Sequence, residues 1–304
     1  MKDHHPAAGT VVPPAVSPRA AAPYRPGMDV QRIPVAGGDL AVEVRSGASA
    51  PVLAVHGISS SRRLWDWLHA EAPDLTLVAP DLRGRGDSLA VAGPSSVHQH
   101  AEDLVAVLDA LDLEQVVVCG MSMGGFVAVD LAVHHPGRVR SLVLVDGGYP
   151  MAPPPGLTPE LLPVVFADRL ARLEQPWPSL EEYAAFFTSA TAPLLDPADP
   201  LVRGYLAHDL DADGRVRLSG EALLQDAASV FFGPERWREL TVPVRFSWAE
   251  WGAAPGAAPA YPGGAPDGAD PVDARYLPGL DHAGAIMTKQ GAVAAAELLT
   301  GALA

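Results

Sequence analysis

Short apolar runs alternate with amphipathic stretches along most of this chain, and the alternation predicts a parallel sheet flanked by helices. Residues 30–35 and 40–45 enclose two glycines and predict a hairpin of two strands. Helical periodicity is clearest at residues 97–111, where apolar side chains share one face. Near-continuous apolar runs, typical of strands buried on both faces, predict further strands at residues 52–55, 75–80, 115–119, 141–145, 242–248 and 274–277. We therefore expect an α/β fold with helices on both faces of the sheet.

The alternation of strands and helices breaks off at residues 149–240. Helical segments are predicted there at residues 160–174, 179–189 and 221–232, and strand patterning is absent. A helical cap over an active site would give this pattern, and so would a helical layer that only completes the core. We predict a cap at residues 149–240, inserted into a core made of residues 29–148 and 241–304.

Composition narrows the classes of partner. A net charge of -15 argues against nucleic acids and anionic membranes and leaves a small molecule as the expected partner, whereas the oligomeric state stays open. The one cysteine, Cys119, excludes an intrachain disulfide. No apolar run approaches the roughly 18 residues of a membrane span. Residues 1–28 lack the apolar segment of a signal peptide, so we expect a disordered tail and a cytoplasmic protein.

The most informative stretch is residues 118–125, which contain the pattern G-x-S-x-G around Ser122. A β-branched run precedes this stretch, and an apolar segment with helical spacing follows it. A strand, a tight turn and a helix are the context of a nucleophile elbow, in which a strained serine is held above the sheet edge. The flanking glycines leave room for that turn. Ser122 is therefore the candidate nucleophile.

Three further motifs surround the elbow in a fixed order. His56-Gly57-Ile58 follows one predicted strand, residues 81–88 (DLRGRGDS) follow the next, and His282 precedes the last helix. Together with the elbow, this order closely resembles the α/β-hydrolase superfamily, over about residues 30–303. The resemblance implies an eight-stranded, mostly parallel sheet, a helical cap inserted after the sixth strand, and a catalytic triad of serine, acid and histidine.

The remaining catalytic roles follow from what a serine hydroxyl needs. The hydroxyl is a poor nucleophile without a nearby base, and His282 is the candidate base because its loop can return to the elbow. An oxyanion needs preorganised donors, for which the backbone N–H groups of Met123 and Ile58 are the candidates. His56 is interpreted as a structural support of its turn. Asp81 and Arg83 are interpreted as braces of their loop.

The triad acid is where the sequence departs from the superfamily pattern. The commonest acid position, after the seventh strand, is occupied here by Gly252. Asp146, at the end of the sixth predicted strand, and Glu250, two residues before the usual position, both preserve the order serine, acid, histidine. We prefer Asp146, because it needs no realignment and stands before two glycines that let the chain turn away. Glu250 remains the alternative.

These assignments predict a cofactor-free serine hydrolase that cleaves a small apolar ester, thioester or lactone. No metal-ligand spacing or nucleotide-binding motif is present in the sequence, so no metal or cofactor is expected. Trp65 and Met121 are the candidate substrate-binding residues, with cap aromatics as further possible walls. Hydrolysis of a carbon–carbon bond and perhydrolysis are alternatives that use the same triad. A degenerate hydrolase that only binds a small molecule is the alternative from another class.

Overall fold

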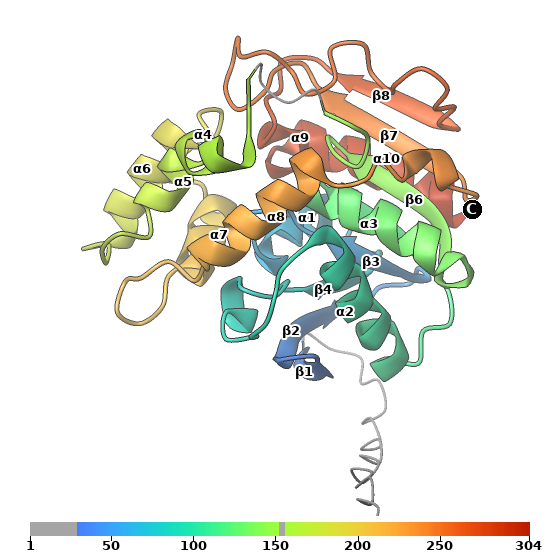
Figure 1. Ribbon diagram of the computed structural model, residues 1–304, viewed down its shortest axis with the longest axis horizontal. Coiled ribbons are helices and arrows are strands. Elements are labelled where there is room, and N and C mark those ends of the chain that lie inside the picture. Colours follow the sequence, from blue (N-terminus) through green and yellow to red (C-terminus); the bar gives the residue numbers. More distant parts are fainter. Residues whose placement is uncertain (1–28, 152–155) are drawn as a thin grey trace, which may run out of the picture.

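The computed structural model describes residues 29–151 and 156–304, so the tail expected at residues 1–28 lies outside the described residues. One eight-stranded sheet, with the order β1-β2-β4-β3-β5-β6-β7-β8, forms the centre of the molecule (Figure 1). Strands β1 and β2 form the predicted hairpin, β2 is antiparallel to β4, and all other pairs are parallel. The strands are β1 (Asp29–Val35), β2 (Gly38–Arg45), β3 (Pro51–Val55), β4 (Thr76–Pro80), β5 (Val116–Met121), β6 (Val139–Val145), β7 (Val244–Ala249) and β8 (Asp273–Leu277). The expected α/β fold with a mostly parallel sheet is confirmed.

Helices cover both faces of this sheet and create two apolar cores. Strand β5 shows how one strand serves both, since Val116 and Val118 join one cluster while Val117 and Cys119 join the other. The first core includes side chains of α2 and α3, and the second includes side chains of α1 and α10. This alternation follows from the period of two in a strand and explains the continuous apolar runs in the sequence. The helices of the core are α1 (Asp66–Glu71), α2 (Val97–Ala110), α3 (Met123–His134), α9 (Gly284–Met287) and α10 (Lys289–Leu303), with 3-10 turns η1 (Arg62–Trp65), η2 (Gly86–Ser88) and η3 (Pro136–Arg138).

Between β6 and β7 the chain forms a helical insertion, within the part that we predict to be a cap. Its helices are α4 (Leu162–Val165), α5 (Ala167–Ala171), α6 (Leu180–Ala190), α7 (Pro200–Asp209) and α8 (Gly220–Phe232), with turns η4 (Pro159–Leu161) and η5 (Trp237–Glu239). Helices α4 to α7 lie together at the left in Figure 1, and α8 connects them with the core, where it contacts α2 and α3. The described residues of this segment form no strand, and their β-pairing is limited to isolated bridges at Leu210, Val216 and Leu218.

The helices of the structure differ from the predicted ones at three places. The single helix expected at residues 160–174 is two short helices, α4 and α5, separated at Phe166. Helix α7 is not predicted by the sequence pattern, because its mix of polar and apolar residues gives a weak signal. The closing helix breaks at Thr288, whose extended backbone ends α9 and whose hydroxyl accepts the Gly291 N–H to start α10.

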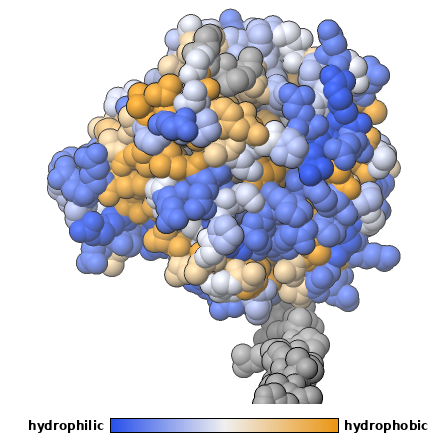
Figure 2. Space-filling view, viewed as in Figure 1, coloured by the Kyte–Doolittle hydropathy of each residue, from blue (hydrophilic) through white to orange (hydrophobic). Residues whose placement is uncertain are grey.

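The surface of the insertion carries exposed apolar side chains. Figure 2 shows apolar surface on the left of the molecule, over the region where Figure 1 draws the insertion. Leu161, Val164 and Val165, in η4 and α4, are among the exposed large hydrophobic residues. No helix in residues 29–151 and 156–304 has both the length and the apolar character needed to cross a membrane.

Candidate active site

Ser122 occupies a strained turn between β5 and α3. Its backbone has φ 55° and ψ -124°, which an L-residue rarely adopts. Only glycine fits around the turn: a Cβ at Gly120 would lie 2.2 Å from the Gly124 carbonyl oxygen, and one at Gly124 would lie 2.0 Å from the Val55 carbonyl oxygen. The Ser122 N–H donates to the Val145 carbonyl oxygen (3.0 Å), which ties the turn to β6. The predicted elbow geometry is therefore present, and its serine is partly exposed to solvent.

His282 lies between Ser122 and Asp146. Its Nε2 is 3.0 Å from the Ser122 Oγ, and its Nδ1 is 2.6 Å from the Asp146 Oδ2. Since a carboxylate only accepts hydrogen bonds, Nδ1 carries the proton, and Nε2 is free to accept the Ser122 hydroxyl proton. The three side chains come from the ends of β5 and β6 and from the loop after β8, so the sheet places them at one edge.

Asp146 is itself held rigidly. Its φ of 44° is in the left-handed region, and its N–H donates to the Ser247 carbonyl oxygen (2.7 Å). Its second carboxylate oxygen, Oδ1, accepts the Ala249 N–H (3.2 Å), and its side chain is buried. The next residue must be small, because a Cβ at Gly147 would lie 2.1 Å from the Ser122 carbonyl oxygen. The acid and the serine turn are thus packed directly against each other.

Glu250, the alternative acid, is placed elsewhere. Its Oε2 accepts the Gly279 N–H (2.7 Å), at the turn after β8. Between the two candidates, the structure brings only Asp146 to His282. Gly252, at the usual acid position, positions the histidine through the backbone, because its carbonyl oxygen accepts the His282 N–H (2.8 Å).

The two candidate oxyanion donors flank the serine. Met123 is the first residue of α3, and the first N–H groups of a helix have no acceptor within it. Ile58 follows Gly57 in the turn after β3, and a Cβ at Gly57 would lie 3.3 Å from the Ser122 Cβ, so this turn touches the nucleophile. The use of both N–H groups as an oxyanion hole stays a prediction.

His56 supports this turn from the core, as expected. Its Nε2 accepts the Leu82 N–H (3.0 Å), so its proton is on Nδ1, which donates to the Gly57 carbonyl oxygen (2.8 Å). Burial lowers the pKa of His56 to about 4, although the Asp81 charge opposes the shift. The ring is therefore neutral at pH 7, and it fixes the peptide unit that carries the Ile58 N–H.

The candidate substrate-binding residues are both buried. Trp65 is 0% exposed and Met121 is 5% exposed, and both belong to the core cluster that also includes side chains of the insertion. Tyr183 and Phe187 of α6 are buried in the same cluster. Burial of these side chains is what a core role requires, so contact of Trp65 and Met121 with a substrate stays a prediction.

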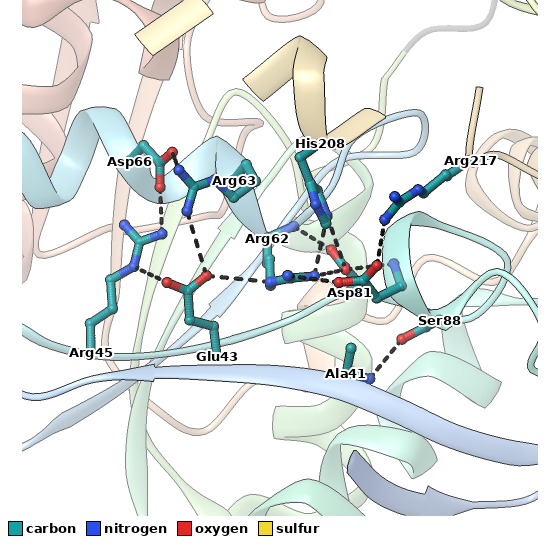
Figure 3. Close-up of polar contacts among 11 residues, drawn as sticks. Ala41, Glu43, Arg45, Arg62, Arg63, Asp66, Asp81, Ser88, His208 and Arg217 are labelled. Carbon is teal, nitrogen blue, oxygen red and sulfur yellow. Dashed lines mark hydrogen bonds and ion pairs between the residues drawn. The ribbon is translucent and has the colours of Figure 1, made fainter. Parts of the chain in front are cut away.

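Two groups among the described residues have metal-ligand side chains close together. Asp81, Asp87 and His208 form the first, but Arg62 already pairs with both of its carboxylates. Figure 3 shows the pair of Arg62 with Asp81. In the second, the Nδ1 atoms of His98 and His134 each lie 2.9 Å from the Asp130 Oδ1. Neither group includes Ser122, Asp146 or His282.

Sequence comparison identifies the fold family that this geometry indicates. The family model described as alpha/beta hydrolase fold matches residues 50–176, which include β3, the elbow and the start of the insertion. Residues 50–176 of this chain therefore belong to the α/β-hydrolase superfamily. The matched segment contains Ser122 and Asp146, and the described sheet extends the fold beyond it to β8.

Curated relatives match this chain over about a third of its length. Lipase LipV of Mycobacterium tuberculosis is 41% identical over 110 residues, which are 36% of this chain and 41% of that protein. The 2-hydroxymuconate semialdehyde hydrolase of Pseudomonas sp. (strain CF600) is 38% identical over 109 residues, which are 33% of this chain and 37% of that protein. The chain thus spans less than half the length of the curated relatives it matches.

Solved structures extend the likeness of fold over nearly the whole chain. An E-2-(acetamidomethylene)succinate hydrolase is 20% identical with a TM-score of 0.68, covering 90% of this chain and 98% of that one. A thermophilic esterase from Thermogutta terrifontis is also 20% identical, with a TM-score of 0.62, covering 91% of this chain and 100% of that one. At this identity the likeness establishes the fold, which many reactions share.

Two arginines near the turn after β3 are not singled out as functional by the sequence. Arg85 lies in the DLRGRGDS segment, and its position inside this motif could have marked it as functional. From the sequence, only Asp81 and Arg83 of this segment are interpreted as braces of the loop. Arg83 does brace its loop, as expected, through Asp103 (2.7 and 2.8 Å). Arg172 lies in the insertion, and no local pattern distinguishes it from the arginines around it.

Proposed function

We propose that this α/β-hydrolase is a serine hydrolase that cleaves a small, apolar ester, thioester or lactone through an acyl-enzyme. The observation that carries the proposal is the hydrogen-bonded series from the Ser122 Oγ to the His282 Nε2 (3.0 Å) and from the His282 Nδ1 to the Asp146 Oδ2 (2.6 Å). A nucleophile, a base and a group that orients the base are the elements of nucleophilic catalysis by serine.

Acylation begins when the Ser122 Oγ attacks the substrate carbonyl carbon and the hydroxyl proton moves to the His282 Nε2. Asp146 keeps the imidazole in the required tautomer and stabilises the imidazolium that forms. The N–H groups of Ile58 and Met123 donate hydrogen bonds to the carbonyl oxygen and stabilise the negative charge that develops on it. Collapse of the tetrahedral intermediate breaks the bond to the leaving alcohol or thiol, which takes the proton from His282. A water molecule, deprotonated by His282, then attacks the acyl carbon. The bond to the Ser122 Oγ breaks, the Oγ takes the proton back from His282, and the carboxylic acid product leaves.

Several features support a neutral, apolar substrate. The net charge of -15 disfavours anionic ligands at low salt. Apolar side chains are exposed on the insertion, at Leu161, Val164 and Val165, on the part of the chain that we propose to be the cap. The similar protein from Mycobacterium tuberculosis is named a lipase, which fits an ester with an apolar acyl group.

A carbon–carbon bond hydrolase is the second candidate, because one similar protein is named 2-hydroxymuconate semialdehyde hydrolase. The same three side chains suit both reactions, so the site alone does not separate them, and perhydrolysis likewise needs no further residue. The proposal that the chain only binds a small molecule has less support, because a serine, a histidine and an aspartate are held within hydrogen-bond distance.

The direct test is hydrolysis of p-nitrophenyl acetate, butyrate and octanoate by the wild type and by Ser122→Ala. We expect turnover by the wild type and a loss of at least about a thousandfold in the variant, since removal of any triad member leaves only binding and the oxyanion hole. A conjugated diketone substrate, assayed in parallel, separates ester from carbon–carbon hydrolysis. Unchanged turnover in Ser122→Ala would contradict the proposal, and wild type inert on all substrates would favour the binding protein.

A further inference from the structure

Three consecutive carbonyl groups in the turn after β3 are held by three buried side chains. The Gly57 carbonyl oxygen accepts from the His56 Nδ1 (2.8 Å), and the Ile58 carbonyl oxygen accepts from the Nε and Nη2 of Arg85 (3.0 and 2.9 Å). The Ser59 carbonyl oxygen accepts from the Nη2 of Arg172 (2.8 Å). We call this segment, residues 57–59, the oxyanion turn. Its backbone is fixed peptide by peptide, and one of the three anchors comes from a distant part of the chain.

Arg172 belongs to the helical insertion, directly after α5. Its side chain is 1% exposed, and its Nη1 donates to the Tyr183 hydroxyl (3.0 Å) of α6 and to the Asp209 Oδ2 (3.2 Å) of α7. The Tyr183 hydroxyl also donates to Asp209. Three insertion helices therefore determine where the guanidinium lies. Among the side-chain hydrogen bonds of Arg172 in the described residues, only the one from Nη2 to the Ser59 carbonyl reaches the core.

Arg85 belongs to the core, but its counter-ion lies in the insertion. The Asp226 Oδ2 of α8 is 2.6 Å from the Arg85 Nη2, and both side chains are 0% exposed. Asp226 is held in turn by the His100 Nε2 (3.0 Å) and the Ser95 Oγ (2.9 Å) of the core. The position of α8 therefore also affects the guanidinium that holds the Ile58 carbonyl.

Contacts from the insertion continue past the oxyanion turn. The Tyr205 hydroxyl of α7 donates to the Ser60 Oγ (3.1 Å). Figure 3 shows the next anchor, where His208 of α7 contacts both Arg62 (3.1 Å) and Asp81 (3.3 Å), which also pair with each other. The Asp81 Oδ1 also accepts the Arg62 N–H (2.7 Å), which holds the backbone where the turn leads into η1. The insertion therefore contacts this segment directly at Ser59, Ser60 and Arg62.

We infer that Arg172 is a positioning residue that makes the oxyanion site depend on the seating of the insertion. An oxyanion hole lowers the barrier only if its donors already point at the developing charge. Because a peptide unit is planar, a held carbonyl also fixes the N–H of the same unit. His56 fixes the unit that carries the Ile58 N–H, and Arg85 and Arg172 fix the two units that follow. The inference rests on the proposed function, since it assigns an oxyanion to this turn.

The consequence is a coupling between the insertion and catalysis. When the insertion is seated, the Ser59 carbonyl is bonded and the turn is rigid. When the insertion moves away, the turn loses the Arg172 anchor and the partner of Arg85 together. Binding of a substrate that holds the insertion in place would then also preorganise the oxyanion donors.

The test compares Arg172→Met with two matched variants in the insertion. Tyr183→Phe alters the same buried cluster but leaves the bond from Arg172 to Ser59. Arg203→Met removes a side chain whose ion pair with Glu181 (2.6 Å) is on the surface. For each protein, kcat and KM for p-nitrophenyl butyrate and amide hydrogen exchange in peptides that cover residues 54–64 are measured. Arg172→Lys, which keeps the charge and can reach one acceptor, serves as the conservative variant.

We expect Arg172→Met to lower kcat about ten- to a hundredfold with KM within about threefold, less than the loss of a whole oxyanion donor. Exchange in residues 54–64 should rise at least about fivefold, while peptides from α3 and β5 stay protected. In Tyr183→Phe, kcat should fall much less and exchange in residues 54–64 should rise much less than in Arg172→Met. Arg172→Lys should recover part of kcat, and Arg203→Met should match the wild type.

Two results would overturn the inference. One is exchange in residues 54–64 of Arg172→Met that equals the wild type. The other is equal losses in Arg172→Met and Tyr183→Phe, which would mean that only the packing of the insertion matters. If the wild type hydrolyses no ester, the proposed function fails, whereas hydrogen exchange still decides whether Arg172 fixes the turn.

Discussion

The core segment from β3 to the turn after β6 and the helical insertion contribute to the same site in different ways. The core segment supplies Ser122 and Asp146, two of the three described non-glycine residues with positive φ, and these are set by the local backbone. The insertion supplies Arg172 and Asp226, which act through side chains that cross from one part of the chain to another. A residue whose role depends on its local backbone conformation leaves a motif in the sequence. A side chain that acts on a residue far away in the sequence, as Arg172 does on Ser59 at a separation of 113 residues, leaves none.

Among the changes that compare the two regions, the largest loss of activity is expected from adding a Cβ in the tightly packed turn after β6. Gly147→Ala places a Cβ 2.1 Å from the Ser122 carbonyl oxygen, so the serine turn or the Asp146 strand end has to shift. We expect a loss of activity greater than about a hundredfold, because shifts of about 1 Å in catalytic geometry have that cost. Ester turnover and a thermal melt measure the effect. Gly263→Ala, where no atom lies within 4 Å of the added Cβ, is the control and should behave as wild type.

The next effect tests the buried contact between insertion and core. Asp226→Asn leaves the Arg85 guanidinium buried without a counter-ion, because Arg85 and Asp226 are both 0% exposed. Removal of one partner from a buried pair costs roughly 3 kcal/mol or more. Urea denaturation at pH 7 measures the free energy of unfolding. An unchanged midpoint would mean that the pair does not join the two regions.

A smaller effect on stability is expected from acidification, through the buried His56 of the core. Because the folded pKa of His56 is about 4 and its ordinary value is 6.5, the unfolded chain binds the proton first. The stability from this group is therefore complete above about pH 6.5 and declines as the pH falls toward 4. Between pH 7 and pH 4.5 the free energy of unfolding should fall by roughly 2 kcal/mol from this group.

His56→Gln is the variant that isolates this group, because glutamine does not titrate. Its free energy of unfolding should change less than that of the wild type between the same two pH values in urea titrations. Burial raises the pKa of Asp226, but His100 and Arg85 lower it to about 2 on balance, so this carboxylate adds its own loss only below about pH 4. An equal slope in both proteins would contradict the assignment to His56.

The smallest effect lies on the insertion surface. Glu181→Gln removes the partner of Arg203 (2.6 Å), and the Glu181 side chain is 68% exposed. Such surface pairs contribute about 0.5 kcal/mol or less, so the midpoint of thermal unfolding should move by about one or two degrees at most. A loss as large as that of Asp226→Asn would mean that the insertion depends on its surface charges as much as on its buried ones.

Much of the fold and part of the site could be predicted from the sequence, for reasons that differ by region. All eight strands are predicted, the first two from a hairpin around two glycines and the other six from apolar runs, which strands in the middle of a covered sheet need. Ser122 and His282 stand out because strand ends and glycines mark their turns. The acid stays open between Asp146 and Glu250 in the sequence, since the choice depends on where two strand ends point in space. Helix α7 and the anchor Arg172 escape prediction, because their roles arise from tertiary contacts with Asp81 and Ser59 that leave no local pattern.

The most direct test of the central claim is labelling with a fluorophosphonate, followed by mass mapping of the adduct. The proteins to compare are the wild type, Ser122→Ala, Asp146→Asn and Glu250→Gln. We predict one adduct on Ser122 in the wild type and in Glu250→Gln, none in Ser122→Ala, and labelling slowed by at least about a hundredfold in Asp146→Asn, where His282 loses its orienting carboxylate. An adduct on another residue, or labelling lost in Glu250→Gln and kept in Asp146→Asn, would contradict the account.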